Sequence, residues 1–168
     1  MPAKKHVLIA ISILALLAGL ALTLTQKQMA PKIELSTLDG KQVALDSLHG
    51  KVVLVNFWAT SCPGCIKEMP LLVDTYRKYQ MRGLEIVAVA MSYDPPEYVR
   101  NYVQQRNLPF TVALDTTGGA AKAFNQVKLT PTTFIIDRQG RIIQQTLGEL
   151  DFTQLHTLLE QHLGGVAP

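Results

Sequence analysis

Cysteine and histidine are scarce in this chain of 168 residues, which has two cysteines and four histidines. Cys62 and Cys65 stand in the motif CPGC, and the next residue is Ile66. A c-type haem needs histidine directly after the second cysteine, and a structural zinc site needs four ligands, so neither fits well. A copper-delivery module would have a wider cysteine spacing and a histidine in the range 104–148, which has none. A static disulfide and a redox-active pair remain.

An excess of one charge sign is also lacking. The net charge of +3 depends on Lys4 and Lys5, because without them 14 basic residues stand against 13 acidic ones. The charges alternate in sign and form no basic stripe, so we expect no nucleic-acid partner. The chain has no internal repeat, and its length and 48% hydrophobic content fit one well-buried domain with short additions.

The first thirty residues differ from the rest because residues 7–24 form an uncharged apolar run. As a helix this run is about 27 Å long, close to the hydrocarbon thickness of a bilayer. A cleaved signal peptide and a buried core helix are the alternatives. Signal cleavage before residue 31 would need small residues where Gln28 stands, next to Lys27. We therefore expect an uncleaved transmembrane anchor over residues 7–25.

The flanking charges predict the orientation of this anchor. Lys4 and Lys5 favour a cytoplasmic segment 1–6, although Lys27 and Lys32 near the other end weaken the asymmetry. A tether over residues 26–32 would then lead to a domain over residues 33–165 outside the cytoplasm. Thiols in that compartment oxidise unless they are actively reduced.

The remainder of the chain alternates strand and helix patterns. Asp39-Gly40 lies between two short alternating segments and predicts a hairpin. Residues 52–59 read as a strand buried on both faces, and apolar residues at spacings of three and four follow as a helix that Pro70 should kink. Further strands are expected at 84–92, 110–115 and in 132–148, and further helices at 95–107, 118–126 and 151–163, with Asp151 as an N-cap. This order predicts an α/β fold with a mixed central sheet flanked by helices.

The cysteine pair falls at the junction of the first long strand and its helix. A helix N-terminus carries partial positive charge, which stabilises a thiolate and lowers the pKa of a cysteine there. Cys62 stands at this end, and Cys65 lies one turn deeper and more shielded. We therefore expect Cys62 to attack a disulfide of a partner and Cys65 to resolve the mixed disulfide.

The segment "NFWATSCPGCIKEMP", together with "LTPTTFIID" some 65 residues later, resembles the TlpA/ResA-like branch of the thioredoxin superfamily. The resemblance covers residues 33–163. It implies a thioredoxin-like fold with an N-terminal hairpin extension and an N-terminal transmembrane helix. It also implies a thiol-disulfide oxidoreductase anchored in the bacterial inner membrane, whose domain faces the periplasm or the cell exterior.

The same resemblance implies the partners. The protein is expected to reduce disulfides of specific extracytoplasmic proteins, as in cytochrome c maturation or metal-centre assembly. A membrane thiol electron donor of the DsbD/CcdA type would re-reduce it. We expect a monomer that uses no cofactor beyond the Cys62–Cys65 disulfide and binds no metal.

The resemblance also assigns roles to residues outside the motif CxxC. Pro131 matches a cis-proline that packs beside the disulfide, and Glu68 matches an acid three residues after the second cysteine. Glu68 and Cys65 share a helix face, so the carboxylate could exchange a proton with the thiol; a solvated surface glutamate is the alternative. Asn56 stands where thioredoxins carry a buried aspartate, and an amide cannot accept that proton.

A last set of residues is expected to contact the partner around the cysteines. These candidate substrate-binding residues are Trp58, Thr60, Ser61, Pro63 and Thr130. A tryptophan that ends a core strand could equally pack inward, so that alternative stays open for Trp58. Ser61 departs from the tryptophan common in this family, and the Pro-Gly order between the cysteines is the reverse of that in thioredoxin, so the redox potential cannot be transferred.

Two other function classes stay open at this point. A thiol peroxidase on a related sheet would need a Pro-x-x-x-Thr-x-x-Cys spacing, which the residues before Cys62 do not provide. A non-catalytic module that binds a protein partner would use the same surface without turning over the cysteines.

Overall fold

The computed structural model describes residues 13, 14, 16 and 28–164. The predicted anchor at 7–25 lies almost entirely outside the described residues, as does the predicted segment 1–6. Within the part that is described, no helix is both long and apolar enough to span a bilayer. The predicted tether at 26–32 is described from Gln28 onward. The Gln28 carbonyl accepts a hydrogen bond from the Ile142 amide of the domain at 2.7 Å.

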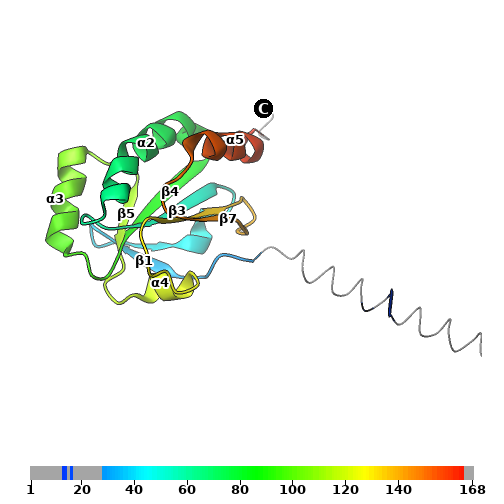
Figure 1. The fold of residues 1–168 in the computed structure, drawn as a ribbon, viewed down its shortest axis with the longest axis horizontal. Helices are drawn as coiled ribbons and strands as arrows, with labels where there is room; N and C mark the ends of the chain where they lie inside the picture. Colours follow the sequence, from blue (N-terminus) through cyan, green and yellow to red (C-terminus); the bar gives the residue numbers. More distant parts are fainter. Residues whose placement is uncertain (1–12, 15, 17–27, 165–168) are drawn as a thin grey trace, which may run out of the picture.

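A seven-stranded mixed sheet forms the centre of the domain (Figure 1), in the order β2-β1-β5-β4-β3-β6-β7. β3 runs parallel to β4 and antiparallel to β6, and β4 runs parallel to β5. The strands are β1 (Glu34–Thr37), β2 (Gln42–Ala44), β3 (Val52–Trp58), β4 (Leu84–Ala90), β5 (Thr111–Leu114), β6 (Thr132–Ile136) and β7 (Ile142–Leu147). The predicted mixed sheet is confirmed.

Helices cover both faces of this sheet (Figure 1). One face carries α2 (Pro63–Tyr79), α3 (Pro96–Arg106) and α5 (Phe152–Leu163), and the other carries the short α4 (Gly119–Ala123) and the 3-10 turn Leu45–Leu48. Another 3-10 turn, Gln80–Arg82, leads from α2 into β4. This is the thioredoxin-like α/β architecture that the sequence predicts.

All seven residues of β3 are buried, as its continuous apolar run predicts. Because side chains alternate along a strand, Leu54 and Trp58 pack under α2 and α5, while Val55 and Phe57 pack toward α4. β3 therefore contributes to both hydrophobic cores. Its carboxyl end holds the cysteine motif in a fixed position.

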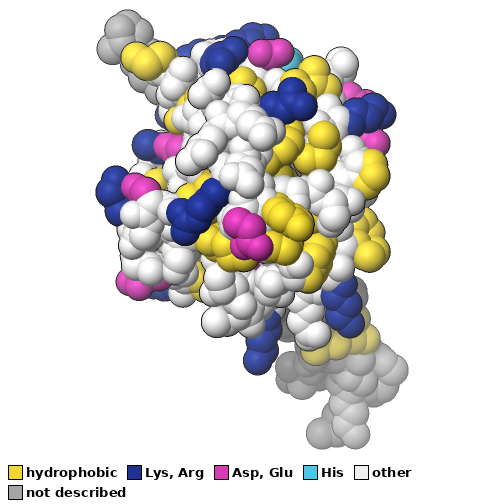
Figure 2. Space-filling view, turned by 90° about the vertical axis from the view of Figure 1, so that its left-hand side faces the viewer, with side chains coloured by type: hydrophobic (Ala, Val, Ile, Leu, Met, Phe, Trp, Pro, Cys, Tyr) yellow, Lys and Arg dark blue, Asp and Glu magenta, His cyan; other side chains and the backbone are white. Residues whose placement is uncertain are grey.

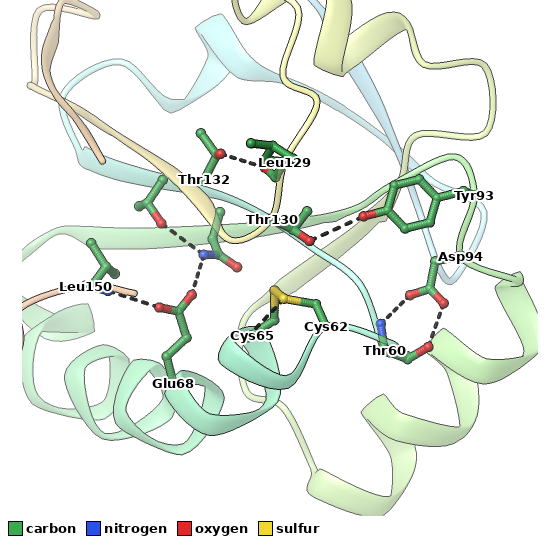
Figure 3. Close-up of a disulfide and its surroundings, with 12 residues drawn as sticks. Thr60, Cys62, Cys65, Glu68, Tyr93, Asp94, Leu129, Thr130, Thr132 and Leu150 are labelled. Atoms are coloured by element: carbon green, nitrogen blue, oxygen red, sulfur yellow. Dashed lines mark hydrogen bonds between the residues drawn. A yellow bond between two sulfur atoms is a disulfide. The ribbon is translucent and has the colours of Figure 1, made fainter. Parts of the chain in front are cut away.

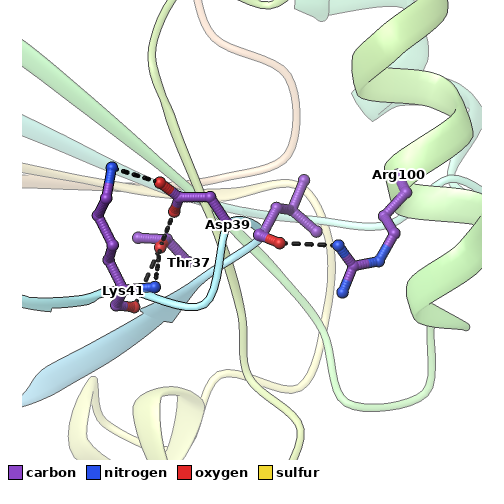
Figure 4. A network of polar contacts seen from close by, with 5 residues as sticks. Thr37, Asp39, Lys41 and Arg100 are labelled. Atoms are coloured by element: carbon purple, nitrogen blue, oxygen red, sulfur yellow. Dashed lines mark hydrogen bonds and ion pairs between the residues drawn. The ribbon is translucent and has the colours of Figure 1, made fainter.

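The N-terminal hairpin is present where Asp39-Gly40 predicts it, between β1 and β2. Figure 4 shows how its turn is held: Lys41 forms an ion pair with Asp39 at 2.7 Å, and Arg100 of α3 donates to the Leu38 carbonyl at 2.7 Å. The Arg100 contact ties the hairpin to a helix on one face of the sheet. Figure 2 views the molecule from the α3 side, where charged side chains of both signs are interspersed with hydrophobic ones.

α2 begins directly after Cys62 and continues through Pro70 to Tyr79. Pro63 occupies the first turn of α2. Amides in a first turn have no acceptor within the helix, so the missing amide hydrogen of proline breaks no helical hydrogen bond. α5 is capped as predicted, because the Asp151 carboxylate accepts from the amides of the next turn at 2.9 and 3.1 Å.

Candidate active site

Cys62 and Cys65 form a disulfide at the start of α2, with a Cα–Cα distance of 5.3 Å (Figure 3). Cys62 is the N-cap of the helix, and its sulfur accepts a hydrogen bond from the Cys65 amide at 3.3 Å. Cys62 is half-buried, whereas Cys65 has no exposed surface. A partner can therefore reach the first sulfur but not the second.

This placement favours one chemistry. The unpaired amides and the dipole of α2 stabilise negative charge on the Cys62 sulfur once the disulfide is reduced. The accessible cysteine is thus also the one whose thiolate is stabilised most directly. The geometry suits nucleophilic attack by Cys62 and resolution by Cys65, which stay predictions from the sequence.

The Thr130–Pro131 peptide bond is cis, as the sequence resemblance implies. Pro131 is buried, and its Cδ lies 3.6 Å from the position that a Cβ on Gly64 would occupy, so the two segments pack together. The Gly148 amide donates to the Pro131 carbonyl at 2.8 Å. Pro131 therefore lies beside the CxxC turn, held from the loop that follows β7.

Glu68 is buried, with 2% of its surface exposed, so the alternative of a solvated surface glutamate is wrong. Its carboxylate accepts from Asn56 Nδ2 at 3.0 Å and from the Leu150 amide at 3.2 Å (Figure 3). Burial raises the pKa of Glu68 above its ordinary value, and the two hydrogen bonds offset part of that rise. A buried carboxyl with a raised pKa on the same helix as Cys65 is suited to proton exchange.

Asn56 holds this carboxyl from the middle of β3. Its Nδ2 also donates to Thr133 Oγ1 of the neighbouring β6 at 3.0 Å. The amide is therefore a donor to Glu68 and not a proton acceptor. Glu68 is the ionisable group next to this amide, which agrees with the expectation that another base replaces the aspartate of thioredoxins.

The candidate substrate-binding residues divide into two groups. Ser61 and Pro63 are exposed at the rim of the disulfide, and Thr60 and Thr130 are half-buried. Trp58 is fully buried and its ring lies 5.4 Å from that of Tyr102, so the expectation that it contacts a partner directly is wrong. The side chain faces the core because it occupies the inward position of a central strand.

Asp94 is a site residue that the sequence analysis did not assign. The Asp94 carboxylate accepts from the Thr60 amide and the Thr60 hydroxyl, both at 2.6 Å. A signal was available: Asp94 follows β4, and the carboxyl ends of parallel neighbours such as β3 and β4 meet at one edge of the sheet. Leu150, whose amide binds Glu68, carried no such signal.

The described residues contain no group of three or more histidine, cysteine or acidic side chains placed to hold a metal ion. The redox-active group that the structure does contain is the Cys62–Cys65 disulfide. The groups that the structure brings together at this site are two sulfurs, one buried carboxyl and a cis-proline segment.

Known proteins resemble this chain in sequence and in fold. The Redoxin family profile matches residues 25–159. The thiol-disulfide oxidoreductase ResA of Bacillus thuringiensis is 38% identical over 139 residues, which cover 83% of this chain and 77% of that protein. ResA of Bacillus subtilis is 34% identical over 127 residues, covering 76% and 70%.

A solved structure has a similar fold. A thiol:disulfide interchange protein of the thioredoxin family from Chlorobium tepidum superposes with a TM-score of 0.76 at 29% identity, covering 83% of this chain and 99% of that one. These names state thiol-disulfide exchange, and the Cys62–Cys65 pair at the N-terminus of α2 is the group in this chain that carries it out. The chain belongs to the redoxin family, and within it to the ResA-like thiol-disulfide oxidoreductases.

Proposed function

We propose that this thiol-disulfide oxidoreductase works as a reductant of disulfides in specific extracytoplasmic proteins, such as those handled in cytochrome c maturation or metal-centre assembly. The difference in exposure between half-buried Cys62 and fully buried Cys65 carries the proposal. A shielded second cysteine lets the reduced pair persist until a partner disulfide reaches the first. The protein acts as a monomer.

The reaction proceeds in two exchanges. The Cys62 thiolate attacks one sulfur of the partner disulfide, a Cys62–partner disulfide forms, and the other partner sulfur leaves as a thiolate. The Cys65 thiolate then attacks the Cys62 sulfur, which closes the intramolecular disulfide and releases the second partner sulfur. The partner gains two electrons, and the pair in this protein is oxidised.

Glu68 has a proton-transfer role in the second exchange. Cys65 must lose its proton before it attacks, and it has no contact with solvent. Glu68 lies on the same face of α2, three residues further along, and its raised pKa makes it a stronger base than an exposed carboxylate. Its protonated form is also the one that burial favours.

The oxidised pair must then be reduced again. We propose that a membrane thiol donor of the DsbD/CcdA type supplies the electrons, and that residues 7–25 anchor the protein in the bacterial inner membrane with the domain outside the cytoplasm. The uncharged run at 7–24 and the lysines before it support this arrangement. The full chain should stay with membranes after alkaline carbonate extraction, whereas a chain lacking residues 1–26 should be released.

The reduction potential of the Cys62–Cys65 pair tests the direction of electron flow. The purified full chain in detergent is equilibrated with glutathione or dithiothreitol redox buffers at pH 7, and its thiols are quantified. A value below about −220 mV identifies a reductant that needs a donor to stay active. A value near about −120 mV identifies an oxidant and contradicts the proposal.

A further inference from the structure

The turn that delivers Cys62 is short and is closed by one backbone bond. The Cys62 amide donates to the Ala59 carbonyl at 3.1 Å, so residues 59–62 form a four-residue turn between β3 and α2. Thr60 is the second residue of this turn. An element that holds Thr60 therefore also helps to hold the backbone from which the Cys62 side chain leaves the turn.

Asp94 is that element (Figure 3). Asp94 is 4% exposed, and its two carboxylate oxygens accept separately from the Thr60 amide and the Thr60 hydroxyl, at 2.6 Å each. Two bonds from one residue to a planar carboxylate define orientation as well as distance. Asp94 itself is held by its amide, which donates to the Met91 carbonyl at 2.9 Å.

The residue before Asp94 reaches the other side of the disulfide. The Tyr93 hydroxyl lies 3.3 Å from Thr130 Oγ1, and Thr130 precedes the cis-proline Pro131 (Figure 3). Consecutive residues of the β4–α3 loop therefore contact the turn before Cys62 and the segment that flanks the disulfide. This loop sets the spacing between the two segments that a partner chain must meet.

We propose that Asp94 is a positioning residue for thiol-disulfide exchange, which fixes Thr60 and so aims the Cys62 sulfur along the line of attack on a partner disulfide. The inference rests on the exchange chemistry at Cys62 and is independent of the direction of electron flow. Exchange and alkylation are both in-line displacements, but oxidised glutathione must bring a bulky disulfide into line at the protein surface, whereas a small reagent can approach the sulfur from many directions. If the Cys62 sulfur is no longer held in this orientation, exchange should therefore slow more than alkylation.

The test compares two second-order rates of the reduced full chain in detergent, one with oxidised glutathione and one with iodoacetamide. Asp94→Ala removes both acceptors and should lower the glutathione rate about tenfold while changing the alkylation rate less than about twofold. Asp94→Asn should restore most of the rate, because its amide can accept from the Thr60 amide and donate to the hydroxyl. Thr60→Val, which loses only the hydroxyl bond, should lie between them.

Asp115→Ala is the matched control. Asp115 is also buried and also accepts two bonds, from the amides of Ala120 and Ala121 at 3.0 and 2.9 Å, but it belongs to the β5–α4 connection. Its loss should reduce stability and leave both rates unchanged below the unfolding temperature. If Asp94→Ala does not fold, Thr60→Val carries the test.

Three results would overturn the inference: unchanged glutathione rates in the Asp94→Ala and Thr60→Val variants, an equal slowing of both reagents, or an Asp94→Asn variant as slow as Asp94→Ala. An equal slowing of both reagents would mean that the reactivity of the Cys62 thiolate itself is altered. A slow Asp94→Asn variant would mean that the charge of Asp94 matters and not its position. A reduction potential typical of an oxidant would contradict the proposed direction of electron flow but would not change the outcome expected for these variants.

Discussion

The contact between Asn56 and Glu68 gives a sharp test of the buried carboxyl. Asn56 Nδ2 lies 3.0 Å from Glu68 Oε1, so Asn56→Asp would place two carboxylate oxygens where a hydrogen bond now stands. At 3.0 Å two unit charges in a medium of effective dielectric constant about 20 repel each other by about 5 to 6 kcal/mol. The whole stability of a domain is about 5 to 15 kcal/mol.

The variant should avoid this repulsion by keeping one proton on the pair in the native state. The native state then binds more protons than the unfolded state, so stability should fall steadily as the pH rises toward 8. Urea unfolding of the oxidised protein between pH 5 and pH 8 measures this slope. The wild type, with a neutral amide at position 56, should show a much shallower fall.

The double variant Asn56→Asp/Glu68→Gln is the control that isolates the contact. It exchanges the carboxyl and the amide across the same 3.0 Å contact, so that a glutamine amide donates to the new carboxylate. At pH 8 it should be more stable than Asn56→Asp alone by several kcal/mol. Equal stabilities of the single and double variants at pH 8 would refute the reasoning that the two side chains meet in a dry site.

Three further changes have defined outcomes. Burial raises the pKa of Glu68 above its ordinary value of 4.5. The contribution of Glu68 to stability is therefore full below pH 4.5 and is lost as the pH rises through the pKa of the native state. In Glu68→Gln, urea unfolding at a series of pH values should show a smaller decrease of the unfolding free energy with pH. Glu149 also raises the pKa of Glu68, so Glu149→Gln should shift that loss to lower pH. Because its ion pair with Lys67 is exposed, breaking that pair should leave the thermal unfolding midpoint almost unchanged. Asp151→Ala removes the cap of α5 and should cost about 0.5 to 2 kcal/mol by urea unfolding, and an unchanged midpoint would exclude the cap as a stabilising contact.

Local patterns in the sequence predicted most of the fold, because the relevant forces act within one element. The apolar run 52–59 predicted a central strand, and β3 is buried at every position. The hairpin at Asp39-Gly40 and the cap at Asp151 followed from turn and capping chemistry. The order of the strands was not predicted, since periodicity does not choose neighbours.

The site was less predictable where contacts join distant segments. The choice between a solvated and a buried Glu68 depended on the Leu150 amide, which lies 82 positions away in the chain. Asp94 was overlooked for the same reason, since its bonds to Thr60 span 34 positions. Trp58 was misassigned because a large aromatic residue beside a motif can pack inward or face a partner, and the ring of Tyr102 decides for the core.

The proposed function requires that Cys62 attacks the partner disulfide and that Cys65 resolves the mixed disulfide. Mass spectrometry of two reduced full-chain variants, Cys65→Ser and Cys62→Ser, after incubation with oxidised glutathione tests it most directly. We expect a stable mixed disulfide on half-buried Cys62 in the Cys65→Ser protein, and little or none on fully buried Cys65 in the Cys62→Ser protein. Equal labelling of the two variants, or labelling of Cys65 alone, would contradict it.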